Sequence, residues 1–215
     1  MEYLKKIILP KNIKTIGKFS FAKCTSLNYI DLPETITTIG WSAFMGCKNL
    51  RNVKLPPNLT TLANSIFSAC INLNNIFIPN NINIIERGAF RWCSSLSNIN
   101  IPNSTTLIQG RTFEDCINLS TINLHNNITD IEQLAFWNCK SLEKINLPNN
   151  LKNIGVDAFN GCSKLSEITL PNTVTSIGTG AFDNIPNLVI YVSNNNVENI
   201  LRNVFSGTII NLNRP

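Results

Sequence analysis

LNYIDLPETITTIGWSAFMGCKN, residues 27–49, is one period of a repeat that runs through most of this chain of 215 residues. Phenylalanine keeps a fixed step of 23 positions from Phe21 to Phe205, and leucine keeps the same step from Leu4 to Leu188. Cysteine does so as well, and this column holds all seven cysteines: Cys24, Cys47, Cys70, Cys93, Cys116, Cys139 and Cys162. A constant period of this size is typical of a solenoid, in which each repeat is one coil that buries its face against its neighbours.

The pattern inside one period predicts the local structure of a coil. Ile30 and Leu32 alternate with Asp31, which is the period of a strand. Pro33 suits the end of a strand because proline cannot donate to a ladder. A second extended piece follows over residues 36–39. The next apolar residues fall at i, i+1, i+4 and i+7, which fits one or two helical turns: Ala43, Phe44, Cys47 and Leu50.

Two further columns of the repeat are polar. One holds only short polar residues, as expected for a turn that hydrogen-bonds its own backbone: Asn12, Thr35, Asn58, Asn81, Ser104, Asn127, Asn150, Thr173 and Asn196. The other precedes the leucine, from Ser26 to Asn187, and we expect its side chains to bond the backbone of a neighbouring coil. If the coils stack in register, their strands form one parallel sheet with a spacing of about 4.7–4.9 Å.

The consensus LxxIxLPxxIxxIGxxAFxxCxx resembles the BspA-like family of leucine-rich repeats, the Treponema pallidum type with 23-residue repeats. The resemblance implies a leucine-rich repeat solenoid that is horseshoe-like, α/β but mostly β. It would have a parallel β-sheet and short helical turns on the opposite side. Departures from the consensus are local. His125 replaces the proline, Ile66 and Thr112 replace the alanine, and four residues replace the glycine: Ala63, Glu86, Gln109 and Glu132.

The repeat also predicts the domain organisation. We expect one leucine-rich repeat domain over residues 1–215, with about eight repeats from 4 to 188. The segment 189–215 loses the leucine–proline edge and the cysteine, and it is predicted to be an atypical C-terminal capping repeat, because end repeats usually differ from the others.

The recurring cysteine allows three chemical interpretations: a metal ligand, a disulfide and a nucleophile. Metal sites favour close cysteine pairs with histidines, whereas these cysteines are 23 residues apart and the chain has one histidine. Stacking would bring neighbouring thiols close enough for a disulfide, but an odd number in one column cannot all pair. A free cysteine behaves as a small buried hydrophobe, so the sequence predicts a column of buried, reduced thiols.

The charge is unevenly distributed along the chain. The formal net charge is +5, and residues 1–54 hold nine of the 18 basic residues against three acidic ones. We interpret this basic end as a solvated, lysine-rich cap. Lys5, Lys6, Arg51 and Lys54 near Tyr29 would form only a small basic stripe, so nucleic acid is disfavoured as a partner. No apolar run reaches the ~20 residues of a membrane span, and the start lacks the apolar core of a secretory signal.

Residues suited to catalysis are scarce. His125 lies near Asp130 and Glu132 in the sequence, but it stands at the proline position of a turn, where a solvated substitution is expected. Phosphate-binding, dinucleotide-binding and metalloprotease motifs are absent from the sequence. We therefore expect no catalytic residues, no metal site, no cofactor and no small-molecule substrate, and we interpret the chain as non-enzymatic.

The candidate binding face is the side of the strand column that alternation turns toward solvent. We assign it eight residues: Tyr29, Asp31, Asn52, Lys54, Asn75, Phe77, Asn98 and Asn100. Aromatic side chains on a polar surface are common binding anchors, although isolated surface aromatics also occur without any function. Tyr29 and Phe77 remain open to both interpretations.

Two functional hypotheses follow. The first is an adhesion or protein-binding module at the cell surface or in the secreted fraction, which rests on what the resemblance implies. The second is an intracellular scaffold in the cytoplasm, favoured by the missing signal and by the unpaired cysteines. In both, the expected partner is another protein, with a glycan or a host or matrix protein as alternatives.

Overall fold

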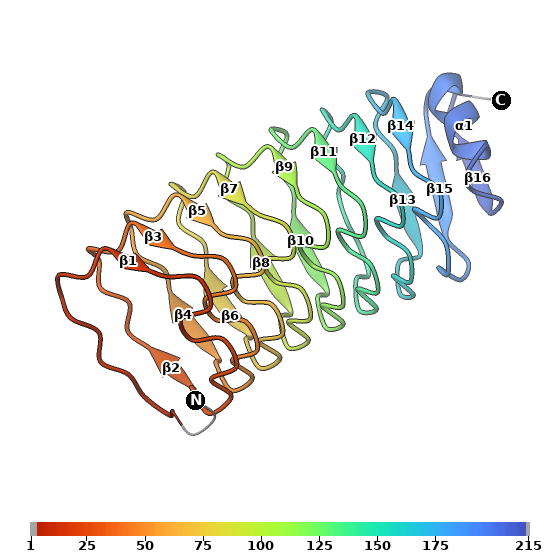
Figure 1. Cartoon of the computed structure of the whole chain (residues 1–215). Helices are drawn as coiled ribbons and strands as arrows, with labels where there is room; N and C mark the ends of the chain where they lie inside the picture. The colour runs from red at the N-terminus through yellow and green to blue at the C-terminus, as the bar shows by residue number, and fades with distance from the viewer. Residues whose placement is uncertain (1–3, 214–215) are drawn as a thin grey trace.

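The computed structural model describes residues 4–213, which form an elongated stack of coils (Figure 1). Each regular coil contributes to two columns of parallel strands that run along the rod. The first strand column contains β2 (Tyr29–Ile30), β4 (Asn52–Lys54), β6 (Asn75–Phe77), β8 (Asn98–Asn100), β10 (Thr121–Asn123), β13 (Glu167–Thr169), β15 (Val189–Val192) and β16 (Thr208–Asn211). The second contains β1 (Thr15–Ile16), β3 (Thr38–Ile39), β5 (Thr61–Leu62), β7 (Ile84–Ile85), β9 (Leu107–Ile108), β11 (Asp130–Ile131), β12 (Asn153–Ile154) and β14 (Ser176–Ile177).

Strand pairing follows the sequence period. Thr15 pairs with Thr38, and Asn52 pairs with Asn75, so each residue lies over its equivalent in the next coil. The predicted solenoid with parallel strands is therefore confirmed. One expectation was incomplete, because the second extended piece of each coil also pairs and forms a column of its own. Its backbone amides and carbonyls need partners once its isoleucines are buried, and the next coil supplies them.

The segment after the second strand column consists of tight turns. Met45 N donates to Ser42 O at 3.1 Å, and Cys47 N donates to Phe44 O at 3.1 Å, so consecutive turns span three residues. Ser42 and Gly46 have φ angles of 54° and 72°, which interrupts any helix. The amides of Ser42, Phe44 and Gly46 instead donate to the next coil. The helical spacing still identified the inward residues correctly, because Ala43, Phe44, Cys47 and Leu50 are all fully buried.

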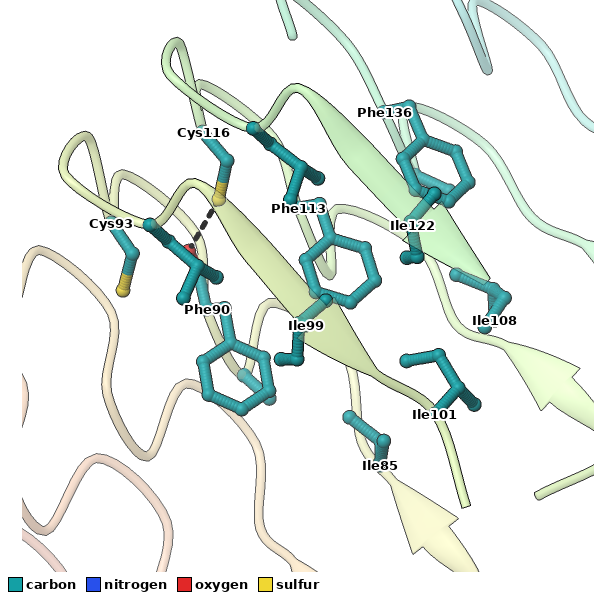
Figure 2. Packing of buried hydrophobic residues seen from close by; sticks show 14 of the residues in the cluster. Ile85, Phe90, Cys93, Ile99, Ile101, Ile108, Phe113, Cys116, Ile122 and Phe136 are labelled. Atoms are coloured by element: carbon teal, nitrogen blue, oxygen red, sulfur yellow. Dashed lines mark hydrogen bonds between the residues drawn. The ribbon is translucent and has the colours of Figure 1, made fainter. Parts of the chain in front are cut away.

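The phenylalanine column forms the centre of the core (Figure 2). Phe90 and Phe113 stack with ring centroids 5.8 Å apart and an interplanar angle of 2°. The same stacking continues from Phe21 to Phe182. Phe205 keeps the sequence step but meets Phe182 edge-on at 77°, so the stack ends at Phe182.

The short polar column ties each coil to the preceding one. Thr35 Oγ1 donates to the carbonyls of Lys11 and Ile13 at 2.9 and 2.7 Å. Asn81 Nδ2 does the same to Pro57 and Leu59 of its preceding coil. The prediction that this column bonds its own turn was wrong, because the stacking of coils places the open carbonyls of the previous turn closer to these side chains.

The glycine column lies directly over the backbone of the preceding coil. A Cβ atom on Gly155 would lie 2.4 Å from Gln133 N, and one on Gly40 would lie 2.5 Å from Lys18 N. Where glycine is replaced, an acceptor side chain reaches the equivalent amide: Glu132 Oε2 accepts from Gly110 N at 2.7 Å. Glu86 and Gln109 bond the amides of Asn64 and Arg87 in the same way, which explains three of the four departures from glycine.

The register changes toward the C-terminus. Glu167 pairs with Val189, an offset of 22, and Val189 pairs with Thr208, an offset of 19. The helix α1 (Asn195–Arg202) follows β15 and buries Val197 and Leu201. Residues 189–215 as a capping repeat, and 1–215 as one domain, stay proposals that these features support. Residues 1–3 and 214–215 of those ranges lie outside the described part of the chain.

Candidate binding surface

The candidate face lies on four consecutive strands of the first column, β2, β4, β6 and β8. All eight predicted residues are exposed: Tyr29, Asp31, Asn52, Lys54, Asn75, Phe77, Asn98 and Asn100. The inward residue of each strand is buried, as with Val53 between Asn52 and Lys54. Strand alternation therefore brings the eight side chains to one side of the sheet.

The asparagines of the candidate face are available to a ligand. Within residues 4–213, the side-chain amides of Asn52, Asn75 and Asn100 have no hydrogen-bond partner. Asn98 Nδ2 donates to Ser97 Oγ at 3.2 Å. Each free amide offers both donors and an acceptor. The face can therefore recognise hydrogen-bonding groups of a protein or a sugar.

Two aromatic side chains rise from this polar surface. Phe77 is 71% exposed and Tyr29 is 51% exposed. The exposed tryptophans lie outside the candidate face and are held by local contacts. Trp41 meets Phe19 with ring centroids 4.2 Å apart, and the Arg91 guanidinium carbon lies 3.7 Å from the Trp92 ring centroid. Phe77 and Tyr29 are thus the aromatic groups that the candidate face presents to a partner.

A buried ion cluster, not predicted from the sequence, lies on the turn side. Glu114 is buried, and its two oxygens accept from Arg91 Nη2 at 2.6 Å and Arg111 Nη1 at 2.7 Å. Beside it, Trp92 Nε1 donates to Asp115 at 3.0 Å. The signal was present in the sequence, because Arg91 and Glu114 are 23 residues apart and so stack over each other. These contacts join neighbouring coils and stabilise the rod.

The cysteine column is structural. All seven thiols are free and fully buried. From Cys47 onward each thiol also donates to a phenylalanine carbonyl of the preceding coil, as Cys116 Sγ does to Phe90 O at 3.2 Å (Figure 2). Sequence reasoning predicted burial in the reduced form, which is confirmed, but missed this hydrogen bond. Burial raises the pKa of the Cys47 thiol to about 12 and that of Cys93 well above its ordinary value.

These thiols make stability dependent on alkaline pH. Above pH 9 an unfolded thiol loses its proton, whereas buried Cys93 keeps it, so ionisation favours the unfolded chain. We expect Cys93→Ala to make the fall in unfolding free energy between pH 9 and 11 shallower by about 1 kcal/mol per pH unit. Urea titrations across this range measure the slope. An unchanged slope contradicts the assignment, and so does rapid labelling of most thiols by a thiol reagent in the native protein.

His125 has a structural position. It is half-buried, its Nε2 lies 2.8 Å from Pro102 O, and its Nδ1 accepts from Asn127 N at 3.3 Å. The expectation of a solvated side chain was wrong, since the ring fills the place of the proline. Asp130 and Glu132 bond Thr129 Oγ1, Asn153 Nδ2 and Gly110 N, so the ring is not joined to a carboxylate.

The described chain was also searched for metal groups and membrane spans. Within residues 4–213, no three His, Cys, Asp or Glu side chains gather as metal ligands. None of the helices in that range has the length and hydropathy to cross a bilayer. A hollow of about 620 Å³ lies beside Tyr29, Arg51 and Lys5, at the N-terminal end of the first strand column.

Comparison with known proteins identifies the family. The sequence matches the BspA type leucine rich repeat region, in six copies, over residues 1–93 and 83–211. The chain belongs to the BspA-type leucine-rich repeat family. The predicted leucine-rich repeat solenoid is thereby confirmed, and leucine-rich repeat proteins of this kind generally act as interaction or adhesion modules.

Solved BspA-type and other leucine-rich repeat structures share this fold. A leucine-rich repeat protein of Treponema pallidum is 29% identical with a TM-score of 0.68, covering 75% of this chain and 78% of its own. One from Bacteroides ovatus is 23% identical with a TM-score of 0.55, covering 95% and 76%. A leucine-rich cell surface protein of Faecalibacterium prausnitzii is 22% identical with a TM-score of 0.51, covering 94% and 70%. A search of curated proteins gives no match.

Proposed function

We propose that this BspA-type protein is a non-enzymatic adhesion or protein-binding module whose ligand contacts the candidate face. The observation that carries the proposal is Phe77, a largely exposed ring surrounded by unpartnered amides on neighbouring strands. An exposed aromatic anchor among polar groups is the usual composition of a binding hot spot. The regular spacing of the strands makes the face rigid, so little conformational entropy is lost on binding.

The charges of the face suit a polar partner. Asp31 and Lys54 are both exposed, and Lys54 Nζ lies 3.9 Å from Glu34 in a fully solvated pair. Such a pair contributes little to stability, so both groups can be redirected toward a ligand. The expected ligand is another protein, including a host or matrix protein, and a glycan is the alternative.

We expect Phe77→Ala and Tyr29→Ala together to weaken binding of the partner by at least about tenfold, because each removes an anchor that packing does not need. A screen of the full chain against immobilised matrix proteins and glycans, followed by biolayer interferometry, measures the change. Trp41→Ala is the matched control, since it removes a half-exposed ring from outside the face. Unchanged binding in the double variant would move the site off the candidate face.

The second candidate is an intracellular scaffold, and the free cysteines favour it. Seven reduced thiols without a disulfide are typical of a reducing compartment. Cell-surface placement is supported by the shared fold with the F. prausnitzii surface protein. Protease treatment of intact cells separates the two candidates: digestion of the protein supports adhesion, and complete protection supports the scaffold.

A further inference from the structure

From the hollow beside Tyr29 we infer that this end of the face binds an acidic saccharide, a sugar chain that carries sulfate or carboxylate groups. The inference rests on the proposed use of the candidate face and names a ligand class for its N-terminal end. The hollow measures about 620 Å³ and lies at the start of β2 and β4. Sites for small ligands commonly measure about 300–1,000 Å³, so one or two sugar rings fit.

The charge of the hollow is wholly positive. Its lining contains the cations Lys5 and Arg51 and no carboxylate. Both side chains are exposed, and neither has an ion pair within residues 4–213. The surrounding segment, residues 1–54, has nine basic and three acidic residues, which adds a positive field at this end of the rod. A sulfate or carboxylate group would therefore find two unpaired cations.

The rest of the lining suits a sugar. Asn28, Asn49 and Asn52 contribute amides that can donate to and accept from hydroxyl groups, and Ser26 adds a hydroxyl. The Tyr29 ring is half exposed and offers an apolar surface to the C–H face of a pyranose. Cations, amides and one aromatic ring together match the three kinds of group on an acidic saccharide.

Nucleic acid is the competing anionic polymer. Strands of nucleic acid bind to a series of aromatic rings on which successive bases stack. The hollow contains one ring, and the next aromatic group on the face, Phe77, lies on β6, with β4 between them. The numerous amides also serve hydroxyl groups better than a phosphate backbone. The lining therefore favours the saccharide.

The test is titration of the full-length protein at physiological salt with four probes: heparin, hyaluronan, neutral dextran and an oligothymidylate. We expect binding of heparin or hyaluronan and none of dextran. Heparin alone indicates recognition of sulfate, whereas binding of both indicates recognition of carboxylate. Tighter binding of the oligothymidylate than of either acidic saccharide would overturn the inference in favour of nucleic acid, and absence of binding to both acidic saccharides would overturn it outright.

Variants locate the site. Arg51→Gln and Tyr29→Ala should each weaken binding of the acidic saccharide by about five- to tenfold. Lys152→Gln removes the same charge from an exposed position after the second polar turn of another coil, and should change affinity by less than about twofold. Equal losses for Arg51→Gln and Lys152→Gln would show non-specific attraction and contradict the site. Phe77→Ala lies outside the hollow, so its effect on a protein partner reports on the proposed function separately.

Discussion

Phe113→Ala is expected to lower the free energy of unfolding by about 3–5 kcal/mol, the cost of a large cavity in a closed core. Phe113 is fully buried and is stacked between Phe90 and Phe136, with centroid separations of 5.8 and 5.4 Å. Neighbouring coils cannot collapse into the gap, because their own rings are fixed by the next coils. Urea or guanidinium titration followed by circular dichroism measures the loss.

Phe205→Ala is the matched control for this change. Phe205 is half-buried and meets the end of the stack edge-on, so its removal should cost clearly less than that of Phe113. Equal losses at the two positions would show that the ring stack is not the centre of the core.

Gly155→Ala is expected to cost about 2–3 kcal/mol through overpacking. The added methyl group would lie 2.4 Å from Gln133 N and 2.5 Å from Glu132 C, and both are backbone atoms that can move only if the coils separate. Thermal and urea unfolding of the variant measure the loss. The substitution tests the close approach of adjacent coils rather than the conformational freedom of glycine.

Gly17→Ala provides the control in the same column of the first coil. There the nearest atom to an added methyl group is Ser20 Oγ at 3.3 Å, a side-chain atom that can move. We expect a change of less than about 1 kcal/mol, with a contribution in favour of alanine from the reduced entropy of the unfolded chain. A similar loss for both variants would contradict the explanation of the glycine column.

Much of the fold was predictable because a solenoid repeats its contacts. Once Phe44 is assigned inward, the fixed step of 23 residues assigns Phe67 and Phe90 as well, and the structure stacks them. The same step placed the cysteines in the core. Exposure of the candidate face followed from strand alternation, since Val53 has to face inward and its neighbours outward.

Other features depend on contacts between coils that a single period does not reveal. Trp92 and Lys23 adopt φ angles of 61° and 59°, although neither residue favours this conformation. Their backbone amides each donate to the next coil at 2.7 Å, which offsets the strain. The offset of 22 between Glu167 and Val189 was hidden because Leu188 keeps the sequence step. The hollow beside Tyr29 was missed because Lys5 and Arg51 belong to coils on either side of it.

The stacking of equivalent coils in register is tested most directly by deleting one whole period. Removal of residues 119–141, which are 23 residues, joins Asn118 to Leu142 and leaves every column in register while Arg91, Arg111 and Glu114 stay in place. We predict a protein that unfolds cooperatively, keeps its remaining thiols protected, and is shorter by about 4.8 Å in small-angle scattering. Removal of residues 119–129 should abolish this behaviour because it shifts the columns. If both deletions fold equally well, or the whole-period deletion is unfolded, the coils are not stacked as described.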